Sequence, residues 1–127
     1  VERLKLEDVY FTGHISFAEI LAYYSLADVF LCMSEHEGFC VPLAEAMAFE
    51  IPIIAYDSSA IAGTLGGSGI LLKEKDCRAA AEMIHRLMTD GSLKASVIYN
   101  QNIRLKDFEH DAIKEQFQKY ISNFSGE

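Results

Sequence analysis

Two glutamates, where a predicted strand is followed by a predicted helix, are the residues whose types and spacing best suit chemistry. Glu37 lies in the polar loop over 34–40, and Glu45 lies about one turn inside the helix that follows. A carboxylate that accepts two hydroxyls of one sugar ring forms a charge-assisted clamp. The pair therefore predicts one carboxylate for each of two sugar-like groups. The alternative is a pair that only complements the helix dipole, as glutamates near helix starts do in many α/β proteins.

The start of the same helix predicts an anion site. Backbone N–H groups around Gly38 to Pro42 have no partner inside the helix, and the helix dipole favours negative charge there. Gly38 has no side chain, so a phosphate or a sugar can approach its backbone closely. These features predict a diphosphate between the two sugar-like groups.

Apolar runs alternate with segments of helical periodicity, which is the order of a doubly wound parallel sheet. A capping box at Ser16 and Glu19 opens the first helix, in which Tyr23 and Tyr24 are interpreted as core residues. We expect strands over 9–12, 29–33, 51–56 and 69–72. We expect helices from Ser16 to about residue 28, over 43–49, from Asp76 to Gly91, from Ser92 to about residue 105 and over 110–123, with a glycine-rich loop over 58–69.

The fold class that follows is α/β, with a Rossmann-like parallel sheet and helices on both faces. The run over 29–33 has no polar alternation, so we expect a strand buried on both sides. Ligands of such sheets bind outside the carboxyl ends of the strands. The loops after Phe11, Met33, Tyr56 and Leu72 are therefore predicted to converge on one crevice.

Composition restricts the function classes. The 127 residues suit a single domain over 1–127, with 50% hydrophobic and 24% charged residues. The net charge is −8 and the basic residues are scattered, which argues against nucleic acid, and against a membrane surface, as a partner of this piece alone. No apolar run approaches the roughly 20 residues of a transmembrane helix. The three cysteines and four histidines lack metal-site spacing, so no metal is expected.

The stretch from Ser34 to Ala55 resembles the signature of the family 4 (group 1) glycosyltransferases, which are retaining nucleotide-sugar enzymes of the GT-B fold. The family pattern reads, loosely, S-x-x-E-G-(F/W)-G-x-x-x-x-E-A-M-A-x-G-x-P-V-I-A. The segments over 11–15, 21–31 and 69–72 are also similar to family segments, so the resemblance covers about residues 9 to 123. The matching residues of the signature are Ser34, Glu37, Gly38, Phe39, Pro42, Glu45, Ala46, Met47, Ala48, Pro52, Ile53, Ile54 and Ala55.

The resemblance implies a role for each residue of the loop. Glu37, as the catalytic candidate, would bind hydroxyls of the donor sugar and shield positive charge at the anomeric carbon. The backbone N–H groups of Gly38, Phe39 and Cys40 would meet the sugar and the diphosphate. Glu45 would accept hydrogen bonds from the ribose hydroxyls of the nucleotide.

The resemblance also implies that the loop at Gly13 and His14 lies against the nucleotide base. By residue type alone, a loop histidine such as His14 is more often simply solvated. The implied reaction transfers a sugar from a UDP- or GDP-sugar donor to an acceptor hydroxyl with retention of configuration. The resemblance implies no bound metal or other cofactor, and a setting in polysaccharide or glycan biosynthesis.

Departures from the family pattern limit what this chain is expected to do. Cys40 replaces a usual Gly, Glu50 stands where a Gly commonly ends the helix, and Ala62–Gly63 stand where many members have Pro-Glu. The family has an upstream Arg and Lys that neutralise the diphosphate, but no basic pair that follows a strand precedes Val9, so Arg3 and Lys5 are not assigned this role. We therefore expect a fragment of the C-terminal donor-binding domain, without its first strands or the N-terminal acceptor domain. Such a fragment is expected to fold but not to turn over alone.

The expected localisation is cytoplasmic, with peripheral association at the inner face of the membrane through the full-length protein. A second function class is a non-catalytic α/β interaction module that docks a partner through the helix over 110–123. Periodicity does not separate the two classes, but the signature from Glu37 to Glu45 favours the glycosyltransferase. The apolar stripe of that helix comprises Ile113, Phe117, Tyr120 and Ile121.

Overall fold

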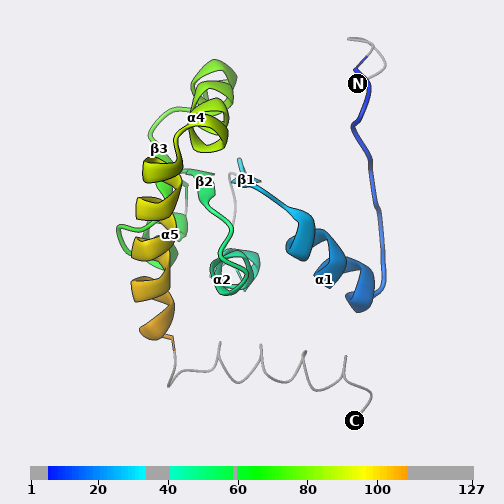
Figure 1. Ribbon diagram of the computed structural model, residues 1–127, viewed down its shortest axis with the longest axis horizontal. Helices are drawn as coiled ribbons and strands as arrows, with labels where there is room; N and C mark the ends of the chain where they lie inside the picture. The colour runs from blue at the N-terminus through cyan, green and yellow to red at the C-terminus, as the bar shows by residue number, and fades with distance from the viewer. Residues whose placement is uncertain (1–5, 34–40, 59, 109–127) are drawn as a thin grey trace.

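Within residues 6–33, 41–58 and 60–108, which are the part of the chain that the structure describes, three strands form one parallel sheet. The structure is a computed structural model, and Figure 1 shows its elements. The strands lie in the order β1-β2-β3, with Phe30 opposite Ile53 and Ile54 opposite Ile70. Their bounds are β1 (Phe30–Cys32), β2 (Ile53–Tyr56) and β3 (Ile70–Leu72).

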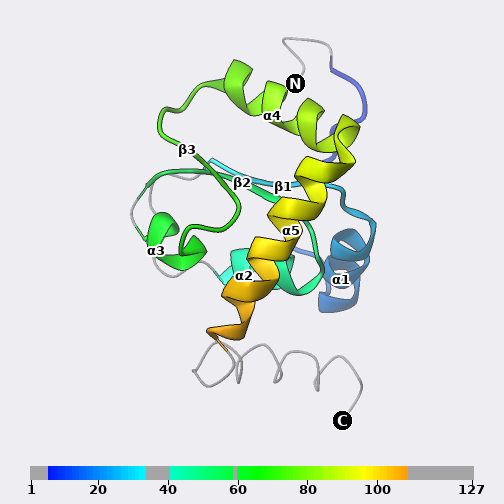
Figure 2. The ribbon, with the colours of Figure 1, turned by 60° about the vertical axis from the view of Figure 1, so that its left-hand side comes forward.

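Helices cover both faces of this sheet, which confirms the predicted α/β class. Because successive side chains of a strand point to opposite faces, Ile53 and Ala55 pack with α2 and α3 while Ile54 packs with α4 and α5. Figure 2 shows α4 on one side of the sheet and α2 with α3 on the other. The helices are α1 (Phe17–Leu26), α2 (Val41–Ala48), α3 (Ile61–Leu65), α4 (Cys77–Thr89) and α5 (Gly91–Lys106).

The helix α5 links the helical layers on the two faces of the sheet at the amino end of β2. Its residue Gln101 is completely buried, with 0% of its surface exposed. The side-chain Nε2 donates to the carbonyl of Ile51 at 2.8 Å, and Oε1 accepts from the N–H of Ile53 at 2.8 Å. Since both backbone groups lie where β2 begins, α5 covers the amino end of the sheet.

The strand β1 is an edge strand within the described residues, and one of its faces is open. It pairs with β2, and Leu31 is 45% exposed. The prediction that the run over 29–33 is buried on both sides is therefore wrong for the part of the chain described. An unbroken apolar run shows which residues tolerate burial, but the neighbouring elements decide which of them are covered.

The predicted strand over 9–12 is also wrong. These residues are unpaired coil, and Phe11 is 85% exposed. β-propensity reflects packing against neighbouring strands, and here no described strand lies beside the segment to accept its hydrogen bonds.

The predicted glycine-rich loop over 58–69 contains the short helix α3. Gly66 ends it in a left-handed conformation, at a φ of 58°. Arg104 of α5 donates to the carbonyls of Gly63 (2.9 Å) and Thr64 (3.0 Å), which are among the last carbonyls of the helix. A side chain about forty residues away in sequence therefore caps the end of α3, and the local sequence does not predict this contact.

The starts of α1 and α4 agree with the sequence prediction, and α5 begins earlier than predicted. The Ser16 capping box is confirmed, since Ser16 Oγ accepts from the N–H of Glu19 at 3.2 Å. Asp76 caps α4 as predicted. The N-cap of α5 is Asp90 and not Ser92, because the Asp90 carboxylate reaches the N–H of Leu93 at 3.1 Å. The predicted helix over 110–123 lies outside the described residues, so the partner-docking stripe stays a prediction.

Replacing Gln101 by Leu is predicted to lower the free energy of unfolding by about 2–4 kcal/mol, because two buried backbone groups lose their partners. Denaturant-induced unfolding measures the loss. Asn102→Ala is the matched control, since its bond to Glu50 is exposed, and its effect is expected within about 0.5 kcal/mol. Equal losses from both substitutions would show that Gln101 does not fasten α5 to the sheet.

Candidate functional site

Loops converge at the carboxyl end of the sheet, opposite the end that α5 covers. The N–H of Asp57 donates to the carbonyl of Leu72 at 2.8 Å, which ties the loop after β2 to the end of β3. Lys73 reaches the carboxylate of Asp57 at 3.1 Å, and the Lys75 ammonium lies 5.8 Å from the centre of the Tyr56 ring. The predicted convergence is thus confirmed for these two loops. It is wrong for the segment after Phe11, which follows no strand of this sheet.

The residues of the predicted site fall into two groups. Four of them, Glu37, Gly38, Phe39 and Cys40, fall between β1 and α2 in the sequence and lie outside the described residues. Their roles stay predictions. Glu45 lies inside α2, where its side chain and its contacts are described.

Glu45 is a buried carboxylate. It is 8% exposed, and it lies on a helix whose other buried residues, such as Leu43 and Met47, belong to the hydrophobic core. Its Oε1 accepts a hydrogen bond from the Tyr24 hydroxyl of α1, with the two oxygens 3.4 Å apart. A charged group in such surroundings is costly without a partner, and Tyr24 supplies a hydrogen bond.

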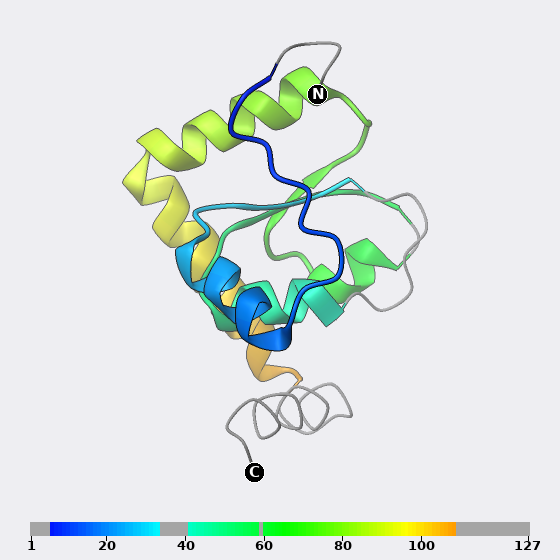
Figure 3. The ribbon, with the colours of Figure 1, turned by 90° about the vertical axis from the view of Figure 1, so that its right-hand side faces the viewer.

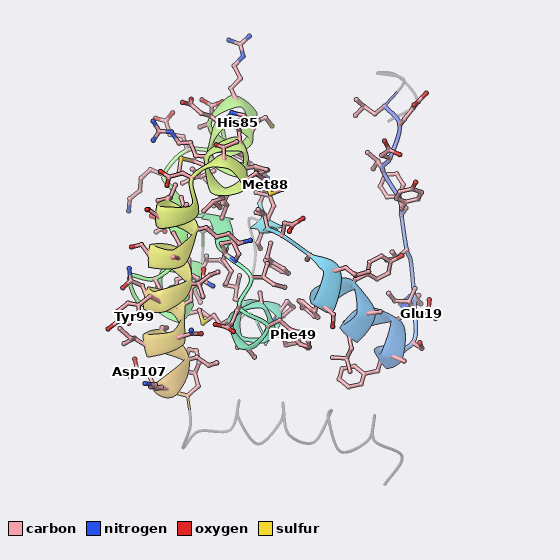
Figure 4. The ribbon with its side chains drawn as sticks, in the orientation of Figure 1. Glu19, Phe49, His85, Met88, Tyr99 and Asp107 are labelled. Carbon is pink, nitrogen blue, oxygen red and sulfur yellow. The ribbon has the colours of Figure 1, made fainter. Side chains whose placement is uncertain are left out.

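The ring of Tyr24 stacks with two other aromatic rings. It stacks on Phe49 at 5.3 Å between centroids and on Phe30 at 6.3 Å, with an angle of 13° between planes in each pair. Phe49 follows the end of α2 on the side that faces α1, as Figure 4 shows. Three elements, α1, β1 and the end of α2, therefore fix the hydroxyl that reaches Glu45.

Burial raises the pKa of the Glu45 carboxyl above its ordinary value, because the protein interior solvates the charged form poorly. The hydrogen bond from Tyr24 acts in the opposite direction, since it stabilises the charged form, and it offsets only part of this effect. Such a combination of burial and a specific partner is common at functional sites, although structural groups also show it.

Gly13 and His14 lie elsewhere in the structure. Both are exposed, and Gly13 adopts a left-handed turn with a φ of 59°. The segment over 6–16 runs along the outer side of α1, away from α2 (Figure 1 and Figure 3). The structure therefore does not bring these two residues to Glu45, and their contact with a nucleotide base stays a prediction.

An apolar groove of about 270 Å³ lies between this segment and α1. Tyr24 lines it with one part of its surface and reaches Glu45 with its hydroxyl. The lining residues are Thr12, Ile15, Ile20, Tyr23, Tyr24, Ala27 and Phe30.

The hydrogen bond from Tyr24 to Glu45 was not predicted from the sequence. The interpretation of Tyr24 as a core residue is correct for its ring, which is half-buried, but not for its hydroxyl. Tyr23 is 54% exposed, so its interpretation as core is wrong. A buried tyrosine usually needs a hydrogen-bond partner for its hydroxyl, which could have indicated such a contact. The partner, Glu45, lies 21 residues away in the sequence.

The described ranges contain no group of three or more His, Cys, Asp or Glu side chains placed to hold a metal ion. No helix in them is long and apolar enough to cross a membrane. The expectation of a site without metal remains a prediction.

A parallel α/β sheet with loops that converge at the carboxyl ends of its strands is typical of ligand-binding domains. Comparison with known proteins then identifies the family: residues 1–104 match the model of the glycosyl transferases group 1. The chain belongs to this family.

Two curated relatives agree with this assignment. The chain is 28% identical over 114 residues to the capsular polysaccharide biosynthesis glycosyltransferase CapM of Staphylococcus aureus, covering 87% of this chain and 30% of the relative. It is 44% identical over 62 residues to the GDP-mannose-dependent alpha-mannosyltransferase of Mycolicibacterium smegmatis, covering 46% of this chain and 16% of the relative. The chain thus spans less than a third of the length of either relative.

Replacing Glu45 by Gln is predicted to stabilise the protein at neutral pH. The raised pKa means that the folded protein binds more protons than the unfolded chain between the two pKa values, so stability falls as pH rises through that window. The destabilisation by Glu45 is complete above the folded-state pKa and disappears below the unfolded value. Gln keeps an oxygen for the Tyr24 hydroxyl and does not titrate.

Melting temperatures of both proteins over an acidic-to-neutral pH series test this prediction. The advantage of Glu45→Gln should grow as pH rises. Glu82→Gln on the exposed surface of α4 controls for the loss of one negative charge. An advantage that grows toward acid pH would contradict the assigned direction of the pKa.

Proposed function

We propose that this chain is a nucleotide-sugar-binding domain, the C-terminal domain of a retaining GT-B glycosyltransferase. The proposal is supported above all by the buried carboxylate of Glu45, held by Tyr24 at one turn inside the helix where the family signature has its second glutamate. Family membership supplies the reaction class, since group 1 members are glycosyl transferases. In this role the domain binds the donor and presents it to an acceptor hydroxyl.

Glu45 accepts hydrogen bonds from the two ribose hydroxyls of the donor nucleotide. A carboxylate carries about four acceptor sites, so it can receive both hydroxyls and the Tyr24 hydroxyl together. The ionised form is required, because a protonated carboxyl gives up acceptor capacity to hold its own hydrogen. The desolvation that raises the pKa of Glu45 is the cost of placing this acceptor in a partly dry site.

The remaining roles follow the family pattern on residues of the loop between β1 and α2. Glu37 binds the donor sugar and shields positive charge at the anomeric carbon. The amides of Gly38, Phe39 and Cys40 bind the sugar and the diphosphate. Amide groups at a helix start suit a diphosphate because the helix dipole adds to their hydrogen bonds.

The donor is a UDP- or GDP-sugar, and the product is a polysaccharide or another glycan. The names of the relatives support both parts, since one is a GDP-mannose-dependent mannosyltransferase and the other is a glycosyltransferase of capsular polysaccharide biosynthesis. The relatives are much longer than this chain, which leaves room for a second domain with the acceptor site. We propose that the donor-binding domain is active only together with such a domain. In this proposal the site operates without a metal, and the protein lies in the cytoplasm with peripheral contact to the membrane.

Titration of the full-length protein with UDP and GDP tests the proposal. We expect one of them to bind, and Glu45→Gln to weaken binding about tenfold or more, the usual value of a hydrogen bond to a charged group. Glu82→Gln should bind as the wild type does. No binding of either nucleotide at millimolar concentration, or an affinity unchanged by Glu45→Gln, would refute the proposed function.

A further inference from the structure

Tyr24 contacts the proposed donor-binding carboxylate from a different element of the fold. Its hydroxyl lies 3.4 Å from Glu45 Oε1, across a separation of 21 residues in sequence. We propose that Tyr24 is a positioning residue for donor binding, which holds the Glu45 carboxylate so that its remaining acceptor sites meet the ribose diol. The inference rests on the proposed function and adds to it a residue on α1.

The aromatic stack makes the hydroxyl of Tyr24 a fixed donor. Phe49 and Phe30 both lie nearly parallel to the tyrosine ring, at interplanar angles of 13°. A ring held by stacked neighbours has little rotational freedom, so the position of its hydroxyl is set before any ligand arrives. Because Phe49 follows α2 and Phe30 begins β1, the stack fixes α1 relative to the helix that carries Glu45.

A fixed donor matters here because the carboxylate has several rotamers and a vicinal diol has a fixed geometry. If the glutamate side chain becomes ordered only on binding, the loss of its conformational entropy weakens the affinity. A side chain that is already ordered avoids this loss. The hydrogen bond from Tyr24 engages Oε1 and so restricts the rotation of the carboxylate plane. Removing the hydroxyl should therefore weaken the recognition of the diol specifically.

The neighbouring tyrosine provides a matched control. Tyr23 lies on the same helix and is 54% exposed. Tyr23→Phe and Tyr24→Phe make the same chemical change at adjacent positions, and both keep the aromatic ring. Only the second removes a donor from Glu45.

The experiment compares UDP with 2′,3′-dideoxy-UDP, and GDP with 2′,3′-dideoxy-GDP, on the full-length protein by titration. The ratio of the two dissociation constants in a pair isolates the contribution of the ribose diol, because base and diphosphate are unchanged. We expect Tyr24→Phe to reduce this ratio about five- to tenfold, which corresponds to the loss of one ordinary hydrogen bond. The affinity for the dideoxy nucleotide should stay unchanged, and Tyr23→Phe should leave both values unchanged.

Two further variants separate positioning from a general structural effect. In Glu45→Gln the diol ratio should already be low, and adding Tyr24→Phe should lower it little further, since the tyrosine acts through the glutamate. Equal weakening of both nucleotides by Tyr24→Phe would overturn the inference in favour of a structural role. An unchanged ratio would overturn it as well.

The same titrations distinguish failure of this inference from failure of the proposed function. A wild-type protein that binds neither nucleotide, or binds the dideoxy form equally well, refutes the assignment of Glu45 to the ribose and the positioning role with it. A wild-type protein that prefers the diol, with a ratio that Tyr24→Phe does not change, refutes only the role of Tyr24.

Discussion

Two hydrogen bonds between Gln101 and the backbone where β2 begins hold α5 against the amino end of this strand. The amide satisfies the carbonyl of Ile51 and the N–H of Ile53, in a position with no access to water. The helix α5 is thereby fixed across the amino end of the sheet, in contact with both helical layers. Because all described strands are parallel, their carboxyl ends lie together at the opposite end of the sheet. There the ion pair between Lys73 and Asp57 connects the loops after β2 and β3.

The same arrangement explains why a costly carboxylate is tolerated inside α2. Glu45 lies on the helix that packs under β2, so its side chain is buried as the helix docks. Burial disfavours its charged form, and the Tyr24 hydroxyl compensates only in part. A residue that destabilises the fold in its functional protonation state is consistent with a binding role, since packing alone would favour an apolar side chain at this position.

Local signals in the sequence predicted the parts of the fold that depend on neighbouring residues. The capping box at Ser16 and the cap at Asp76 were correct, and the apolar runs located β1, β2 and β3 to within a few residues. Features that depend on distant partners were missed. The end of α3 requires Arg104, the exposure of Leu31 depends on what covers β1, and the run over 9–12 has no described strand beside it. For the site, the signature located Glu45, but only the docking of α1 on α2 reveals Tyr24.

In the proposed function, the carboxylate of Glu45 recognises the ribose of a donor nucleotide. A crystal structure of the full-length protein with the bound nucleoside diphosphate tests this most directly. We expect both ribose hydroxyls within hydrogen-bonding distance of Glu45, with Tyr24 still donating to the same carboxylate. A nucleotide bound away from Glu45, or a ribose whose hydroxyls contact other residues, would contradict it.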